Sequence, residues 1–165
     1  MKGIAMTTDS AQRLRHRQAA WRGFDRITAI KTRPDSGERW WQFHYRSRCG
    51  TGCCYAGHVA LAAGGKWLVH IRDHRMLIDD TPVTEADLPA VPYSLWQYML
   101  ATDDDPVHLV REVRGKRVIH VSHRAAHLIG LDPEAEHHDE GGLFESDNTR
   151  GDLERLIAQQ VGPRP

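Results

Sequence analysis

Apolar residues between Ser10 and Thr32 recur at every third or fourth position, with arginines at many of the positions between them. This spacing predicts one long amphipathic helix, whose first turn Asp9 or Ser10 can cap. The helix is predicted to end within residues 33–37, because the residue before a proline avoids the α region and Gly37 permits a turn. The positions of this series are Ala11, Leu14, Gln18, Trp21, Phe24, Ile27 and Ile30, all apolar except Gln18.

A run of small residues follows the sequence Cys49-Gly50-Thr51-Gly52. Thr51 can act as the N-cap of a helix over residues 52–63, which the glycine pair at 64–65 would end. Small side chains let neighbouring helices approach closely. We therefore predict that this segment is the central, buried helix of the fold.

The remaining pattern predicts shorter elements. The aromatic run at 40–45 fits a strand or a loop, and residues 66–71 and 76–78 fit the two strands of a β-hairpin. Three prolines make residues 80–93 irregular, and 94–101 fit a short helix.

The last third of the chain predicts a strand and two helices. Residues 117–121 fit a short strand, after which Ser122 can cap a helix that Gly130 ends. Asn148 or Thr149 can cap a final helix whose apolar residues fall largely on one face.

Together these elements predict a mainly α fold with a minor β-hairpin. The chain has 165 residues, of which 40% are hydrophobic, and such a chain forms an adequate core without disulfides or metal. We expect a flexible tail at residues 1–9 and a single small globular domain over residues 10–162.

The charge is balanced overall but segregated along the chain. Lys plus Arg and Asp plus Glu both number 22, whereas nucleic-acid-binding domains usually carry a basic excess. Arginines crowd the first fifty residues and the region 132–152 is acidic, so nucleic acid binding through the arginine-rich N-terminal part is a minor alternative. No apolar run is long enough to span a membrane, and the start lacks the apolar core of a signal peptide. We expect a cytoplasmic protein with no membrane partner.

The chain's three cysteines, Cys49, Cys53 and Cys54, lie within six residues, which is not the pattern of a disulfide framework. On the predicted helix, Cys53 and Cys54 fall in the first turn, where free amides and the helix dipole favour a thiolate. They are candidate nucleophiles, and His120 on the predicted strand is the candidate base. Burial as small apolar side chains is the favoured interpretation, because cysteine is among the most buried residue types.

The same cysteines are candidate metal ligands together with histidines. Cys49, Cys53, Cys54 and His58 form one cluster, in which His58 lies one helical turn after Cys54. His123 and His127, four residues apart, would supply the rest of a zinc site. No other cofactor is expected, because nucleotide, hydrolase and zinc-protease motifs are absent.

Two segments resemble a known family. They are Cys49-Gly50-Thr51-Gly52-Cys53-Cys54-Tyr55-Ala56-Gly57 and the stretch from Ile129-Gly130-Leu131 through Leu143-Phe144 to Asn148-Thr149-Arg150-Gly151-Asp152-Leu153. They resemble an uncharacterised family of small proteins of actinobacteria and their phages, which share a CGT-x-x-C-x-A-G helix and a C-terminal LGL…LF…NT-x-x-DL module. Ile129 departs from the first leucine of that module, and residues 66–105 match no pattern of the family. The resemblance implies an origin and a context rather than a chemistry.

We therefore expect a small intracellular accessory or regulatory protein of phage or actinobacterial origin that acts by protein–protein contact and is not an enzyme. Two alternatives remain. One is a cysteine-dependent enzyme that uses Cys53 or Cys54 with His120, and the other is a zinc-stabilised nucleic-acid-binding module.

Overall fold

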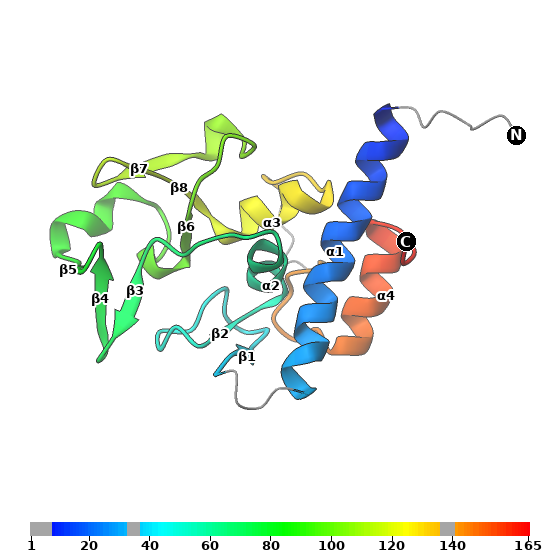
Figure 1. The fold of residues 1–165 in the computed structure, drawn as a ribbon, viewed down its shortest axis with the longest axis horizontal. Coiled ribbons are helices and arrows are strands. Elements are labelled where there is room, and N and C mark those ends of the chain that lie inside the picture. The colour runs from blue at the N-terminus through cyan, green and yellow to red at the C-terminus, as the bar shows by residue number, and fades with distance from the viewer. Residues whose placement is uncertain (1–7, 33–36, 136–140) are drawn as a thin grey trace, which may run out of the picture.

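The fold is seen in a computed structural model that describes residues 8–32, 37–135 and 141–165. Helices contain 43% of the residues described and strands 17%, with the strands arranged in three small sheets. The fold is therefore mixed α/β, and the prediction of a mainly α fold with one minor hairpin is wrong. Figure 1 shows the helices gathered on one side of the molecule and most of the strands on the other.

The helical side consists of α1 (Thr8–Thr32), α2 (Tyr55–Ala62), α3 (Val121–Ile129) and α4 (Arg150–Gln160). Helix α1 contacts each of the other three. The predicted long helix is confirmed, although Thr8 and Asp9 belong to it and not to the expected tail, whose residues 1–7 lie outside the described part. The core between these helices includes Trp21, Phe24, Ile27, Tyr55, Leu143, Phe144, Leu153 and Ile157.

Helix α2 is the buried central helix that the sequence predicts, since its residues from Tyr55 to Ala60 are all buried. Small residues on both partners allow α1 to approach it closely. A Cβ placed on Gly23 of α1 would lie 2.5 Å from Cγ2 of Val59, which is far inside van der Waals contact. The start of α2 is packed as tightly against the strand before it, since a Cβ on Gly57 would lie 2.6 Å from the sulfur of Cys53.

The predicted start of α2 at Gly52 is wrong. Residues Gly52–Cys53 form strand β2, which pairs in parallel with β1 (Arg39–Trp40), and Cys54 is the N-cap residue. Backbone hydrogen bonds hold this segment extended: the amide of Trp41 donates to the carbonyl of Cys53 and the amide of Cys54 to that of His44. Cys53 therefore lies outside the first helical turn.

Two antiparallel sheets form the other side of the molecule. One has the order β3-β4-β5, from His70–Arg72, Arg75–Ile78 and Thr81–Pro82; the other has the order β6-β8-β7, from Tyr98–Leu100, Lys116–His120 and Arg111–Val113. The hairpin at 66–78 is confirmed with shifted bounds. The helix expected over 94–101 is wrong, because only Leu95–Gln97 form a 3-10 turn (η3) and β6 then pairs with β8.

Three of the strand connections are two-residue turns with both central residues at positive φ. They are Asp73-His74, Asp79-Asp80 and Arg114-Gly115. A type I′ turn requires this backbone, and its twist matches that of antiparallel strands.

Residues 80–93, expected to be irregular, contain β5 and the 3-10 helix η2 (Glu85–Ala90). A further 3-10 helix, η4 (Val107–Leu109), precedes β7.

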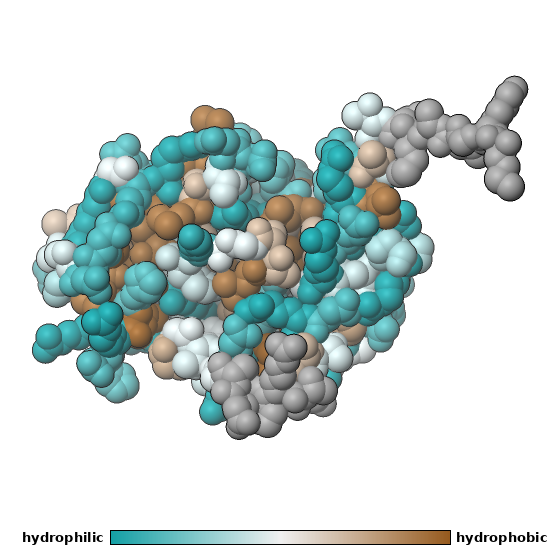
Figure 2. Space-filling view, in the orientation of Figure 1, coloured by the Kyte–Doolittle hydropathy of each residue, from teal (hydrophilic) through white to brown (hydrophobic). Residues whose placement is uncertain are grey.

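The two sides are joined at Met99, Ala60 and Val121, which form a small buried cluster of their own. Arg124 of α3 adds a polar link, because its Nη1 donates to the carbonyl of Leu100 at 2.7 Å and lies 3.8 Å from the buried carboxylate of Asp105. Hydrophilic residues cover most of the visible surface, and hydrophobic ones appear between them (Figure 2). Among the described residues, no helix is long and apolar enough to cross a membrane.

The ends of the last two helices follow the expected capping chemistry, with one exception. Gly130 ends α3 at a φ of +77°, and Thr149 forms a capping box with Asp152 at the start of α4. The exception is Ser122, because His120 is the N-cap of α3 and its ring accepts from the Ser122 amide.

Two glycine substitutions test the contact between α1 and α2. Gly23→Ala is expected to destabilise the protein by about 1–3 kcal/mol, because overpacking against Val59 outweighs the gain in helix propensity. Gly151→Ala is the matched control: the nearest atom to its Cβ is 3.8 Å away, so helix propensity should stabilise by up to about 1 kcal/mol. Urea unfolding measures both, and a stabilising Gly23→Ala would contradict the close contact.

Candidate functional site

The exposed thiol of Cys49 lies in a loop rich in hydroxyl groups. Its sulfur is 3.2 Å from Oγ of Ser47 and 3.1 Å from Oγ1 of Thr51. These hydrogen bonds, with one from the Thr51 backbone, lower the pKa of Cys49 to about 7. A substantial share of this thiol is therefore ionised at neutral pH, which makes it nucleophilic.

Cys53 and Cys54 have the opposite character. Both are buried, and burial raises the pKa of Cys54 to about 11 and that of Cys53 still further. The backbone amides of Ala56 and Gly57 favour the Cys54 thiolate, as expected at a helix start, but desolvation outweighs them. The two residues are protonated thiols that pack against α2.

His58 lies one turn after Cys54 and is 1% exposed. Neither ring nitrogen makes a hydrogen bond of good geometry. Burial and the nearby charge of Arg26 lower the pKa of His58 to about 4, although the backbones of Arg39 and Cys53 lie close enough to oppose this shift. The imidazole is therefore neutral near pH 7.

The ring nitrogens of His120 face side chains other than the thiols. Nδ1 is 2.7 Å from Oγ of Ser122, and Nε2 is 3.3 Å from Oε1 of Gln97. Because an amide oxygen only accepts, Nε2 carries the proton and Nδ1 accepts from the serine hydroxyl. The ring also packs against three tyrosines, Tyr45, Tyr93 and Tyr98. These are not the contacts that a cysteine–histidine catalytic pair needs.

The two histidines of the expected second ligand cluster have different neighbours. The ring centroid of His123 lies 5.6 Å from that of His120. His127 instead lies near His16, and burial together with the charge of His127 lowers the pKa of His16. Within the described ranges, no three or more Cys, His, Asp or Glu side chains are grouped so as to hold a metal ion. The structure thus does not gather Cys49, Cys53, Cys54, His58, His123 and His127 around one point.

A large, mainly apolar groove of about 1170 Å³ lies at the surface of the helical side. The C-terminal part of α1, the segment 38–44 and the segment 146–150 line it. Trp41 and Phe43 lie in it although their side chains are 42% and 73% exposed. We refer to this feature as the 41/43 groove.

Buried Gln42, between these two aromatic residues, ties the groove walls together. Its Oε1 accepts from the amide of Tyr55 and from Nε1 of Trp40, both at 3.1 Å. Its Nε2 donates to the carbonyl of Glu145 at 2.9 Å. Because the middle side chain points inward, the side chains of Trp41 and Phe43 are left at the surface.

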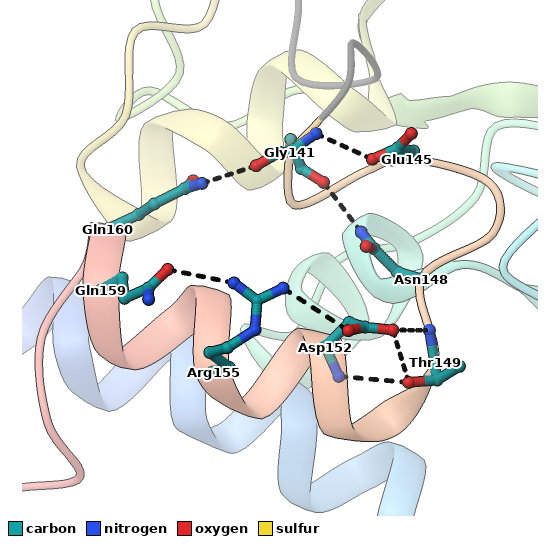
Figure 3. A network of polar contacts seen from close by, with 9 residues as sticks. Gly141, Glu145, Asn148, Thr149, Asp152, Arg155, Gln159 and Gln160 are labelled. Atoms are coloured by element: carbon teal, nitrogen blue, oxygen red, sulfur yellow. Dashed lines mark hydrogen bonds and ion pairs between the residues drawn. The ribbon is translucent and has the colours of Figure 1, made fainter.

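The opposite wall is fixed by its own polar contacts (Figure 3). Asn148 donates to the carbonyl of Gly142 at 2.8 Å, and the carboxylate of Glu145 accepts from the amide of Gly141. The capping box of Thr149 and Asp152 then directs the chain into α4. The carboxylates of Glu145 and Asp152 thus bond to groups within the same segment of the chain.

Sequence reasoning missed Gln42, which lines the groove, and Arg46, which lines a separate cavity. A polar residue inside an aromatic run was the available signal for Gln42. Arg46 is buried, at 6% exposure, but no feature of the sequence distinguishes it from the other arginines.

Comparison of the chain with protein-family models, with curated proteins and with solved structures gave no significant match.

The ionisation of Cys49 can be measured by alkylation. Iodoacetamide should modify Cys49 with a rate that rises as the pH passes through about 7, because only the thiolate reacts. Thr51→Val removes one hydrogen bond to the sulfur and should move this midpoint upward. Thr81→Val, on the distant strand β5, is the control. Mass spectrometry that finds Cys53 or Cys54 modified as fast as Cys49 would contradict the assignment.

Proposed function

We propose that this protein is a small accessory or regulatory protein that binds a segment of another protein in the 41/43 groove. We also propose that it belongs with the small proteins of actinobacteria and their phages that it resembles. The observation that carries the first proposal is the exposure of two large aromatic side chains at an apolar groove.

Aromatic residues dominate the binding energy of protein interfaces, because each buries a large apolar area at a low entropic cost. Phe43 gains little from folding, and Trp41 also keeps 42% of its surface in contact with water. A partner that covers these two side chains gains the free energy of removing their apolar surface from water. Gln42 holds both residues on a fixed backbone, so little order has to be gained on binding.

The charges around the groove indicate the chemistry of the partner. Exposed Arg39 lines it, and the guanidinium of Arg150 lies 5.8 Å above the ring of Trp40. The carboxylate of Glu38 is already engaged by Arg26, and the two arginines outnumber the other acidic residue of the lining, exposed Asp147. We infer that the bound segment carries apolar side chains flanked by Asp or Glu.

The arrangement gives less support to a cysteine-dependent enzyme. Burial keeps Cys53 and Cys54 protonated, and the ring nitrogens of His120 face Ser122 and Gln97.

A peptide-display selection on the purified protein tests the groove. Enriched peptides should combine apolar and acidic residues and should lose roughly tenfold or more in affinity for the double variant Trp41→Ser, Phe43→Ser. The control variant, Leu88→Ser with Val107→Ser, removes exposed apolar residues elsewhere and should bind as the parent does.

Two outcomes would overturn the proposal. One is enrichment of peptides that bind all three proteins equally. The other is a concentration-dependent dimer that the Trp41/Phe43 variant abolishes, because the occupant would then be a second copy of this chain.

A further inference from the structure

A second, smaller cavity of about 230 Å³ lies between the loop 46–53 and α2. Arg46, Cys53, His58 and Trp67 line it. Its volume is several times the roughly 30 Å³ that one water molecule occupies in the liquid. A group of four or five non-hydrogen atoms therefore fits.

Arg46 brings a positive charge into the interior beside this cavity. Its Nη1 donates to the carbonyls of Val69 and Trp96, at 2.8 and 3.1 Å, and its guanidinium lies 4.6 Å above the ring of Trp67. Its Nε is buried without a hydrogen bond. Among the ion pairs of the described residues none involves Arg46, so only backbone dipoles and an aromatic ring compensate this charge.

His58 adds an unused polar group to the same cavity. It is almost completely buried, and neither ring nitrogen has a partner of good hydrogen-bond geometry, although backbone groups of Arg39 and Cys53 lie near the ring. A buried donor or acceptor without a partner costs about 1–3 kcal/mol, and a buried charge without a counter-charge costs more. The poorly bonded ring of His58 and the uncompensated charge of Arg46 lie beside the same cavity, so one bound group could satisfy both.

We propose that this cavity binds a small oxyanion, a carboxylate or phosphate group, through the guanidinium of Arg46 and an N–H of the His58 ring. Such a group supplies both the negative charge that Arg46 lacks and the acceptor oxygen that His58 lacks. A water molecule could accept from either side chain but would bring no negative charge to Arg46. Cys53 remains a neutral thiol and does not repel an anion, and Glu38 at the cavity edge is bound to Arg26.

Free phosphate and small carboxylates share this chemistry, so thermal unfolding should be measured with sodium phosphate, sodium acetate and sodium chloride at equal ionic strength. At about ten times its Kd, the bound anion should raise Tm by roughly 3–5 °C over chloride in a saturable manner. The preferred anion of the two identifies the ligand class.

Three variants separate a binding site from a structural role. His58→Leu replaces the unsatisfied ring with an apolar group, so it should fold with unchanged or higher stability in chloride and lose the anion-dependent rise in Tm. Arg46→Gln should lose that rise too, whereas Arg75→Gln removes an exposed charge elsewhere and should keep it.

His58→Gln, which retains a donor and an acceptor, should recover part of the response. In addition, the NMR titration of His58 should show its ring pKa, about 4 without ligand, rising when the preferred anion is present. No difference between the anions and chloride, or an equal rise in all variants, would overturn the proposal.

Discussion

The contact between α1 and α2 at Gly23 is the constraint on which the rest of the molecule depends. A side chain at this position would overlap Val59, so the two helices lie as close as their backbones allow. The closeness places Ala20 of α1 within reach of Tyr55, whose hydroxyl donates to the Ala20 carbonyl at 3.0 Å. Tyr55 in turn begins α2 and donates its amide to Gln42. These bonds fix the helix pair and the 41/43 groove relative to each other.

The sequence predicts the helices well because their boundaries are set by local chemistry. Thr149 and Asp152 bond to each other, and Gly130 takes a left-handed backbone that other residues avoid. The strands were harder to predict, because each has at most five residues, and because β1 and β6 pair with strands to which no tight turn connects them. Asp79-Asp80 and Arg114-Gly115 were usable turn signals, since Asp and Gly tolerate positive φ. Tyr98 and Met99 instead fit a helix by spacing, and only pairing with β8 makes them a strand.

The burial expected for the cysteines is confirmed at Cys53 and Cys54, where desolvation outweighs the effect of the helix start on the thiol pKa. It is wrong at Cys49, which is exposed and is activated by two neighbouring hydroxyl groups. The residue types alone do not show which of the three thiols the fold leaves at the surface. For the same reason the sequence does not distinguish buried Arg46 from the exposed arginines.

The order of the elements has a consequence for biosynthesis. Helix α1 emerges from the ribosome before α4, but Trp21 on it donates to the carbonyl of Gly162 and shares a core with Leu153 and Ile157 of α4. At roughly 5–20 residues per second, the stretch between the two helices takes on the order of ten seconds to translate. Throughout that interval the apolar face of the nascent helix has no native partner from α4, which makes it a natural substrate for chaperones that bind exposed hydrophobic segments.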